Sequence, residues 1–114
     1  IDRKLSPEDV TWSLWNIVER LAPFGEGNPK PLFLFEDVPV ESVRWFGKEA
    51  QHLEIKLERF DKPLPAIAFF AQRESFSELA KKLTKDDRVS LVGTIEKSTF
   101  GRSPELRLRI VDLV

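Results

Sequence analysis

With 114 residues, 41% of them hydrophobic and 11% aromatic, the chain is suited to one packed domain, and this composition argues against global disorder. It has no cysteine and a single histidine, which excludes disulfide frameworks, cysteine nucleophiles and multi-histidine metal sites. It also has neither a signal-peptide pattern nor the ~20 consecutive apolar residues of a membrane span, and its formal charge of −1 argues against a strongly basic nucleic-acid binder.

Residues 1–31 are expected to form an N-terminal helix followed by a Gly/Pro-rich turn. Ser6 supplies an N-cap before a proline, Thr11 is a second candidate cap, and Pro23 ends the helix. The predicted buried stripe, at helical spacing, is Val10, Leu14, Ile17, Val18 and Leu21. Trp12 and Trp15 lie beside this stripe, where they either cover the domain's own sheet or dock on another part of a longer protein. Because the chain opens on isoleucine rather than methionine, we expect it to be a piece of such a protein.

Residues 32–114 alternate mostly with period two, which predicts a β-rich barrel. The expected strands are 32–43, 52–58, 64–71, 88–97 and 105–114, with a helix at 74–83. Gly93 lies where a closed sheet needs a kink. Three strands, a helix and two strands are the element order of the five-stranded Greek-key barrel called the oligonucleotide/oligosaccharide-binding (OB) fold. The helix between the third and fourth strands separates this fold from an SH3-like barrel, so we expect an OB fold, in one compact domain with residues 1–31.

Charge and aromatic residues gather where an OB fold binds ligands, which is the face of its second and third strands and the loops joining strands one to two and four to five. Net charge is −3 over residues 1–40, zero over 41–62 and +2 over 63–114. The two loops are expected at 45–51 and 97–104, and both place aromatic rings beside bases, as single-strand binders do. The expected DNA-binding residues are Arg44, Trp45, Phe46, Lys48, His52, Lys56, Lys97, Thr99, Phe100, Arg102, Arg107 and Arg109.

A structural interpretation of the same residues stays open. In that interpretation Trp45 or Phe46 is a core residue of a bent strand, and the arginines are ordinary surface charge. His52 is expected at the rim of the barrel rather than as a general base, because no partner is suggested locally. The sequence has no paired His-Asp spacing for a two-metal hydrolase and no glycine-flanked serine nucleophile, so no catalytic and no metal-binding residue is assigned.

Residues 21–33, Leu-Ala-Pro-Phe-Gly-Glu-Gly-Asn-Pro-Lys-Pro-Leu-Phe, resemble the segment that leads into the C-terminal barrel of RecJ-type single-stranded-DNA-specific exonucleases. Later fragments of the chain follow in the family's order: 47–48, 52–57, 66–69, 93–96 and 109–112. The resemblance covers nearly all of the chain, and the Pro-Phe-Gly-x-Gly-Asn-Pro block is its specific part. Glu54 stands where the family often has lysine, and Lys97-Ser98 stands where an asparagine is common.

The resemblance implies a parent that is a bacterial, cytoplasmic 5′→3′ single-strand DNA exonuclease of the DHH phosphoesterase superfamily, which uses Mn²⁺ or Mg²⁺ in recombination and repair. The catalytic motifs of such a parent lie in upstream domains that this chain lacks. The chain is therefore expected to be a non-catalytic module that binds single-stranded DNA and has no cofactor of its own. The implied partners are single-stranded DNA, the catalytic domains of the same parent chain and a single-strand-binding protein, with no membrane. The alternative is a protein-interaction or architectural barrel that closes the nuclease ring or docks a partner.

Overall fold

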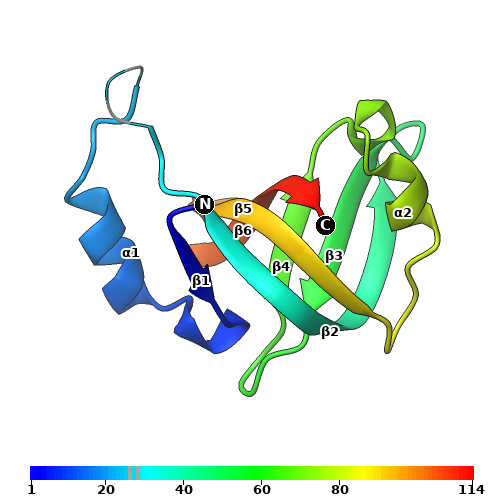
Figure 1. Cartoon of the computed structure of the whole chain (residues 1–114), viewed down its shortest axis with the longest axis horizontal. Helices are drawn as coiled ribbons and strands as arrows, with labels where there is room; N and C mark the ends of the chain where they lie inside the picture. The colour runs from blue at the N-terminus through cyan, green and yellow to red at the C-terminus, as the bar shows by residue number, and fades with distance from the viewer. Residues whose placement is uncertain (26, 28) are drawn as a thin grey trace.

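The computed structural model describes residues 1–25, 27 and 29–114, and its described part contains one six-stranded sheet (Figure 1). The strands are β1 (Arg3–Leu5), β2 (Phe33–Phe46), β3 (His52–Leu57), β4 (Leu64–Ala68), β5 (Arg88–Ser98) and β6 (Glu105–Leu113). The helices are α1 (Trp12–Glu19) and α2 (Ser77–Lys81), with 3-10 turns at Pro7–Asp9 and Ala71–Arg73. None of the helices in this part of the chain is long and apolar enough to cross a membrane. The expected order of strands and helices is confirmed, whereas β1 and both 3-10 turns were not expected.

Five of the strands close into a barrel. The pairing runs from β2 through β3, β4, β6 and β5, and β5 pairs again with β2. All of these pairings are antiparallel except that of β4 with β6, which is parallel. The helix α2 lies between β4 and β5 in the chain, and in Figure 1 it lies on the opposite side of the barrel from α1. This topology confirms the predicted OB fold.

The core of the barrel follows from the alternation of its strands. Leu53, Ile55 and Leu57 of β3 are fully buried, as their period-two spacing predicts. Fully buried side chains from the other strands meet them, namely Phe35, Val40, Leu64, Leu91 and Leu108. Each such side chain stabilises the fold by roughly 1.5–3 kcal/mol relative to an exposed position. The polar residues between them must therefore face outward.

A bend in β2 allows this one strand to pair with two neighbours. Its first part pairs with β5 and its second part with β3, with register shifts between Phe35 and Val38 and between Val40 and Ser42. Asp37 has the left-handed backbone angle φ of 51° at this bend. Its N–H group donates to Ser90 Oγ at 2.8 Å, and Arg88 donates to its Oδ1 at 3.0 Å and to its carbonyl oxygen at 2.8 Å. β5 thus holds the bend with three hydrogen bonds.

The helix α1 is shorter than the sequence pattern predicted. Thr11 Oγ1 accepts the N–H of Leu14 at 3.2 Å, which makes Thr11 the N-cap, while the residues before it form their own 3-10 turn. Val18 is buried, but Ile17 and Leu21 are 56% and 52% exposed. The expected single apolar stripe is therefore not wholly buried, because Val10 precedes the helix and Leu21 follows it.

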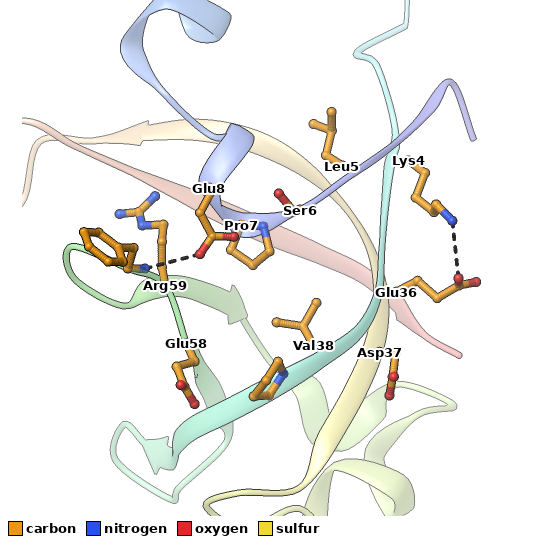
Figure 2. Close-up of a pocket in the computed structure, with 12 residues that line it drawn as sticks. Lys4, Leu5, Ser6, Pro7, Glu8, Glu36, Asp37, Val38, Glu58 and Arg59 are labelled. Atoms are coloured by element: carbon orange, nitrogen blue, oxygen red, sulfur yellow. Dashed lines mark hydrogen bonds and ion pairs between the residues drawn. The ribbon is translucent and has the colours of Figure 1, made fainter.

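The segment before β2 packs on the core through Val18, Leu14 and Trp15, and hydrogen bonds attach it to the barrel at two places. β1 pairs in parallel with the start of β2, which crosses the boundary expected at residue 31. At the other place, the β3–β4 turn contacts the first 3-10 turn and the residue after it: the Phe60 N–H donates to Glu8 Oε2 at 3.2 Å (Figure 2), and Arg59 Nη1 donates to the Val10 carbonyl at 3.2 Å. Residues 26 and 28 of the expected Gly/Pro-rich turn lie outside the described residues.

Gly93 lies where β5 and β6 approach too closely for a side chain. A Cβ atom at this position would lie 2.6 Å from the carbonyl oxygen of Arg109, next to a register shift between the two strands. We predict that Gly93→Ala lowers the free energy of unfolding by about 1–3 kcal/mol, because backbone atoms must move to admit the methyl group. Urea denaturation measures this change.

The matched control is Gly101→Ala in the β5–β6 loop, where the nearest atom would lie 3.8 Å from the new Cβ. Its expected effect is within about 0.5 kcal/mol. Equal stabilities of the two variants would contradict the close approach at Gly93.

Candidate nucleic-acid interface

One side of the barrel presents the outward residues of several strands, and we call it the outer face. On β3, Leu53, Ile55 and Leu57 face the core. The residues that alternate with them therefore point outward, namely His52, Glu54 and Lys56. The antiparallel register sets Phe46 beside His52 and Arg44 beside Glu54, and the register of β5 with β6 sets Glu96 beside Arg107. The outer face consists of Arg44, Phe46, His52, Glu54, Lys56, Phe69, Phe70, Glu96, Arg107 and Arg109.

An aromatic cluster occupies one end of the outer face. The His52 ring lies 5.3 Å from the Phe46 ring, 5.2 Å from the Phe69 ring and 4.8 Å from the Phe70 ring, measured between centroids. Phe69 and Phe70 are 37% and 46% exposed, so their rings remain accessible. Edge-to-face contacts of this kind stabilise a cluster without covering every ring face.

Two local constraints fix the His52 ring at the centre of this cluster. Its Nδ1 accepts the backbone N–H of Phe70 at 3.0 Å, so in the neutral ring the proton lies on Nε2. Gly47 makes room for the ring: a Cβ at this residue would lie 2.7 Å from His52 Cδ2, and its φ of 97° favours glycine. Phe70 has the left-handed φ of 54°, which directs its N–H toward the imidazole.

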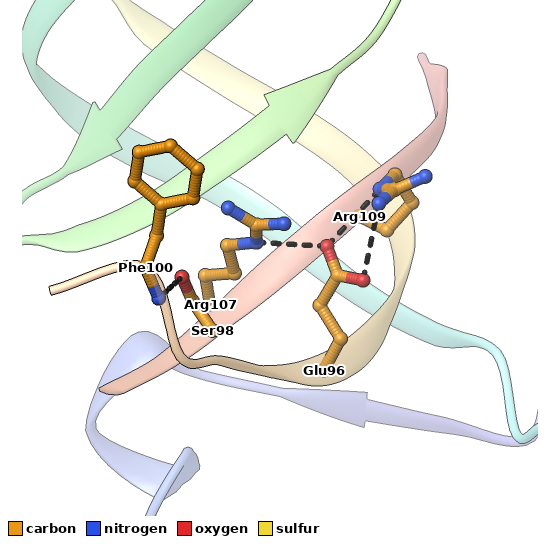
Figure 3. A network of polar contacts seen from close by, with 5 residues as sticks. All are labelled: Glu96, Ser98, Phe100, Arg107 and Arg109. Atoms are coloured by element: carbon orange, nitrogen blue, oxygen red, sulfur yellow. Dashed lines mark hydrogen bonds and ion pairs between the residues drawn. The ribbon is translucent and has the colours of Figure 1, made fainter. Parts of the chain in front are cut away.

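Arginines border the aromatic rings, and glutamates hold these arginines in place. The guanidinium carbon of Arg109 lies 4.6 Å from the Phe69 centroid, and that of Arg44 lies 4.7 Å from the Phe46 centroid. Arg107 and Arg109 share Glu96, with Nε–Oε1 distances of 2.8 and 3.1 Å, and Figure 3 shows all three on one side of the β5–β6 hairpin. Arg44 pairs with Glu54 at 3.2 Å. The two glutamates thus neutralise part of the charge and orient the guanidinium groups.

A second group of cations is not engaged in this way. Lys48, Lys56, Lys97 and Arg102 form no ion pair with any other residue that the structure describes. Lys56 is on the outer face, whereas Lys48 and Arg102 are exposed on the two loops that flank it. Their ammonium and guanidinium groups are therefore the charges most available to a phosphate.

The structure separates the residues that the sequence predicted as one site. Arg44, Phe46, His52, Lys56, Arg107 and Arg109 lie together on the outer face. Trp45 is half-buried and packs against the core, as the structural interpretation of this residue held. Lys97 pairs with the buried Leu106, so it lies on the reverse side of the hairpin from Arg107.

The β5–β6 loop carries the remaining predicted residues. Thr99, Phe100 and Arg102 are exposed on it, and the Phe100 side chain is 99% exposed. In Figure 3, Phe100 projects to the same side of the hairpin as Arg107. The loop therefore continues the outer face beyond the edge of the barrel.

Sequence reasoning missed Phe69 and Phe70, which were assigned to the strand 64–71. The strand ends at Ala68, and the left-handed backbone of Phe70 turns both rings out of the core. A signal was available, because adjacent residues of a strand point to opposite faces and two neighbouring phenylalanines cannot both be buried in the barrel. Glu96 was missed because its role depends on pairing with another strand.

A hollow between the first 3-10 turn and the bend of β2, which we call the acidic hollow, has the wrong charge for a phosphate. Its volume is about 760 Å³, and Figure 2 shows four acidic side chains along it: Glu8, Glu36, Asp37 and Glu58. Lys4, one of its two cations, is paired with Glu36 at 3.5 Å. The described residues also contain no group of three or more His, Asp or Glu that could hold a metal ion, so the Mn²⁺ or Mg²⁺ implied for the parent has no ligand set in this part of the chain.

Comparison with known families identifies this barrel. The family model of the RecJ OB domain matches residues 1–112. The chain belongs to the RecJ OB domain family. The resemblance noted in the sequence is thereby confirmed, and it extends over the N-terminal helix as well as the barrel.

Individual relatives agree with this assignment to the RecJ OB domain. The single-stranded-DNA-specific exonuclease RecJ of Bacillus subtilis (strain 168) is 27% identical over 112 residues, which are 98% of this chain and 14% of that protein. RecJ from Thermus thermophilus in complex with Mn²⁺ matches 98% of this chain and 15% of its own, with a TM-score of 0.70 and 24% identity. Its Mg²⁺ complex matches 88% of this chain and 14% of its own, with a TM-score of 0.62 and 25% identity. The chain thus spans about a seventh of the length of these relatives.

The hydrogen bond between Phe70 and His52 predicts how the aromatic cluster responds to substitution. We expect His52→Ala to raise the hydrogen-exchange rate of the Phe70 amide at least tenfold, because this N–H group loses its acceptor, and to lower the free energy of unfolding by about 1 kcal/mol. Exchange followed by NMR measures the first effect. Lys48→Ala in the adjacent loop is the control and should change neither. An unchanged Phe70 exchange rate in His52→Ala would contradict the proposed anchoring.

Proposed function

We propose that this chain is the single-stranded-DNA-binding module of a 5′→3′ single-strand-specific exonuclease, and that the strand runs across the outer face. The observation that carries this proposal is the accessible aromatic cluster bordered by arginines. Bases stack on exposed rings with ~1–3 kcal/mol each, whatever their sequence. Phe69 and Phe70 supply such rings within one cluster.

The distribution of charge explains how a chain with a formal charge of −1 binds a polyanion. Four acidic residues line the acidic hollow, whose lining includes none of the outer-face residues. On and beside the outer face, two glutamates are paired with three arginines, which leaves Lys48, Lys56 and Arg102 to neutralise phosphates. A few available cations support weak, salt-sensitive binding rather than tight binding.

The role in the parent protein follows from the family and is part of the proposal. The chain would hold the strand while catalytic domains elsewhere in the parent, with their Mn²⁺ or Mg²⁺, cleave it from the 5′ end. Action in DNA recombination and repair, location in the bacterial cytoplasm and contact with a single-strand-binding protein remain predictions of the same kind. The printed name of the Bacillus subtilis relative, a single-stranded-DNA-specific exonuclease, supports the substrate class.

A second candidate function is favoured by one observation on α1. Ile17 and Leu21 are exposed on the side of the N-terminal segment that faces away from the barrel core. Because the chain spans 14% of its curated relative, these apolar side chains are candidates for docking on the catalytic domains of the same parent. In that case the barrel is architectural and the isolated chain does not bind DNA.

Fluorescence anisotropy with labelled oligo-dT distinguishes the two functions. We expect micromolar or weaker binding at low salt. The logarithm of the association constant should fall with the logarithm of salt concentration with a slope of about −2, since ~0.7 is expected for each of three neutralised phosphates. Absence of binding at low salt would contradict the DNA-binding proposal and favour the architectural one.

The outer face is tested in the same assay by Phe69→Ala, which removes a stacking ring that Arg109 borders. Its expected effect is an affinity at least fivefold lower. Leu79→Ala, which removes an exposed apolar side chain from α2, is the matched control and should bind like the wild type. Equal effects of the two substitutions would place the strand elsewhere.

A further inference from the structure

A cleft of about 510 Å³ adjoins the outer face at the end opposite the aromatic cluster. We call it the Trp12 cleft; its lining includes Trp12, Lys56, Phe60, Pro63, Pro65 and Pro104. Three parts of the chain form it: the start of α1, the β3–β4 turn and the β5–β6 loop. Its volume lies in the range of ~300–1,000 Å³ that is typical of small-ligand sites.

The Trp12 cleft is continuous with the outer face. Lys56 and Pro65 are register partners on β3 and β4, and Lys56 points outward like His52 and Glu54 of the same strand. Pro104 belongs to the loop that carries Phe100. A strand that crosses the outer face from the aromatic cluster toward this loop therefore reaches the cleft.

The walls of the cleft suit an uncharged planar ring. Trp12 is 44% exposed and Phe60 is 97% exposed, so two aromatic side chains are available there. Most of the charged groups around them are engaged: Lys62 pairs with Glu105 at 3.3 Å, and Glu8 accepts the Phe60 N–H, while Asp61 also lines the cleft. Lys56 forms no ion pair with a described residue and stands where the cleft opens onto the outer face.

The position of Trp12 relative to the β3–β4 turn is held by hydrogen bonds. Arg59 Nε donates to the Lys62 carbonyl at 2.8 Å, and its Nη1 donates to the Val10 carbonyl at 3.2 Å. One guanidinium group thus joins the turn to the residues that precede α1. The cleft is therefore a built feature of the fold rather than a gap between mobile side chains.

We propose that the Trp12 cleft binds one base of the single strand, in addition to the bases on the outer face. The base stacks on Trp12 or Phe60, and Lys56 contacts the adjoining phosphate. This inference rests on the proposed DNA-binding function and adds a specific subsite to it. The acidic hollow shares Glu8, Arg59 and Phe60 with this cleft, but it is lined by four carboxylates and lacks both Trp12 and Lys56.

Photo-crosslinking tests the subsite directly. A dT oligomer carries 5-iododeoxyuridine at one position at a time, and mass spectrometry identifies the residue that is crosslinked on irradiation. We expect one position to crosslink to Trp12 or Phe60 and other positions to crosslink to the aromatic cluster. Crosslinks confined to the aromatic cluster, with binding intact, would overturn the subsite and leave the proposed function standing.

Affinity provides the second measurement. Trp12→Ala and Phe60→Ala should each weaken binding of the same oligomer about tenfold, which is within the range for loss of a stacking ring. Phe60→Ala keeps the test valid if Trp12→Ala unfolds, since its side chain is almost fully exposed. Ile17→Ala, at another exposed apolar residue of α1, is the matched control and should bind like the wild type. Unchanged affinity in both aromatic variants would overturn the subsite, whereas no binding by the wild type would overturn the DNA-binding function as well.

Discussion

The bend of β2 at Asp37 is the constraint on which the closed barrel depends. A straight strand of 14 residues would pair with one neighbour along its length, whereas β2 pairs with β5 before the bend and with β3 after it. Asp37 adopts a left-handed backbone angle there, which is unfavourable for most residues, and hydrogen bonds from Arg88 and to Ser90 offset this cost. Because both partners lie on β5, the bend and the closure of the barrel stabilise each other.

Closure of the barrel in turn determines the outer face. It brings β6 beside β4 and β5 beside β6, so Glu96 meets two arginines from a neighbouring strand. The arginines then border the Phe69 ring, which leaves the barrel because the chain turns at Phe70. Pairing with Glu96 keeps the guanidinium groups over the Phe69 ring and leaves charge compensation of a bound strand mainly to lysines. The outer face thus offers mainly ordered aromatic rings for stacking, and the neutralisation of phosphates is its lesser contribution.

Much of the fold was predictable from the sequence because it depends on local patterns. The alternation in 52–58 predicted β3, and the helix placed between the third and fourth expected strands predicted the topology. β1 was not predictable, since three residues carry no period and their pairing with β2 is decided by tertiary contact. Likewise, the half-buried position of Trp45 depends on how far β2 continues past its bend, which local spacing does not determine.

Strand alternation predicted which part of the candidate site shares one face, but not the full set of residues on that face. Phe46, His52 and Lys56 could be placed on one face from strand alternation, because neighbouring strands share a register. The roles of Glu54 and Glu96 could not, since ion pairs across strands depend on register shifts at bulges. The face on which Lys97 lies could not be predicted for the same reason, because a shift of one residue moves a side chain to the other face of a strand.

The central claim, that a single strand lies on the outer face, is tested most directly by an NMR titration of the isotopically labelled chain with oligo-dT. The account predicts that the amide signals of Lys56, Phe70 and Arg109 shift as the oligomer is added, while those of α2 and of the acidic residues around Asp37 stay in place. Shifts centred on the acidic hollow, or none at low salt, would contradict it.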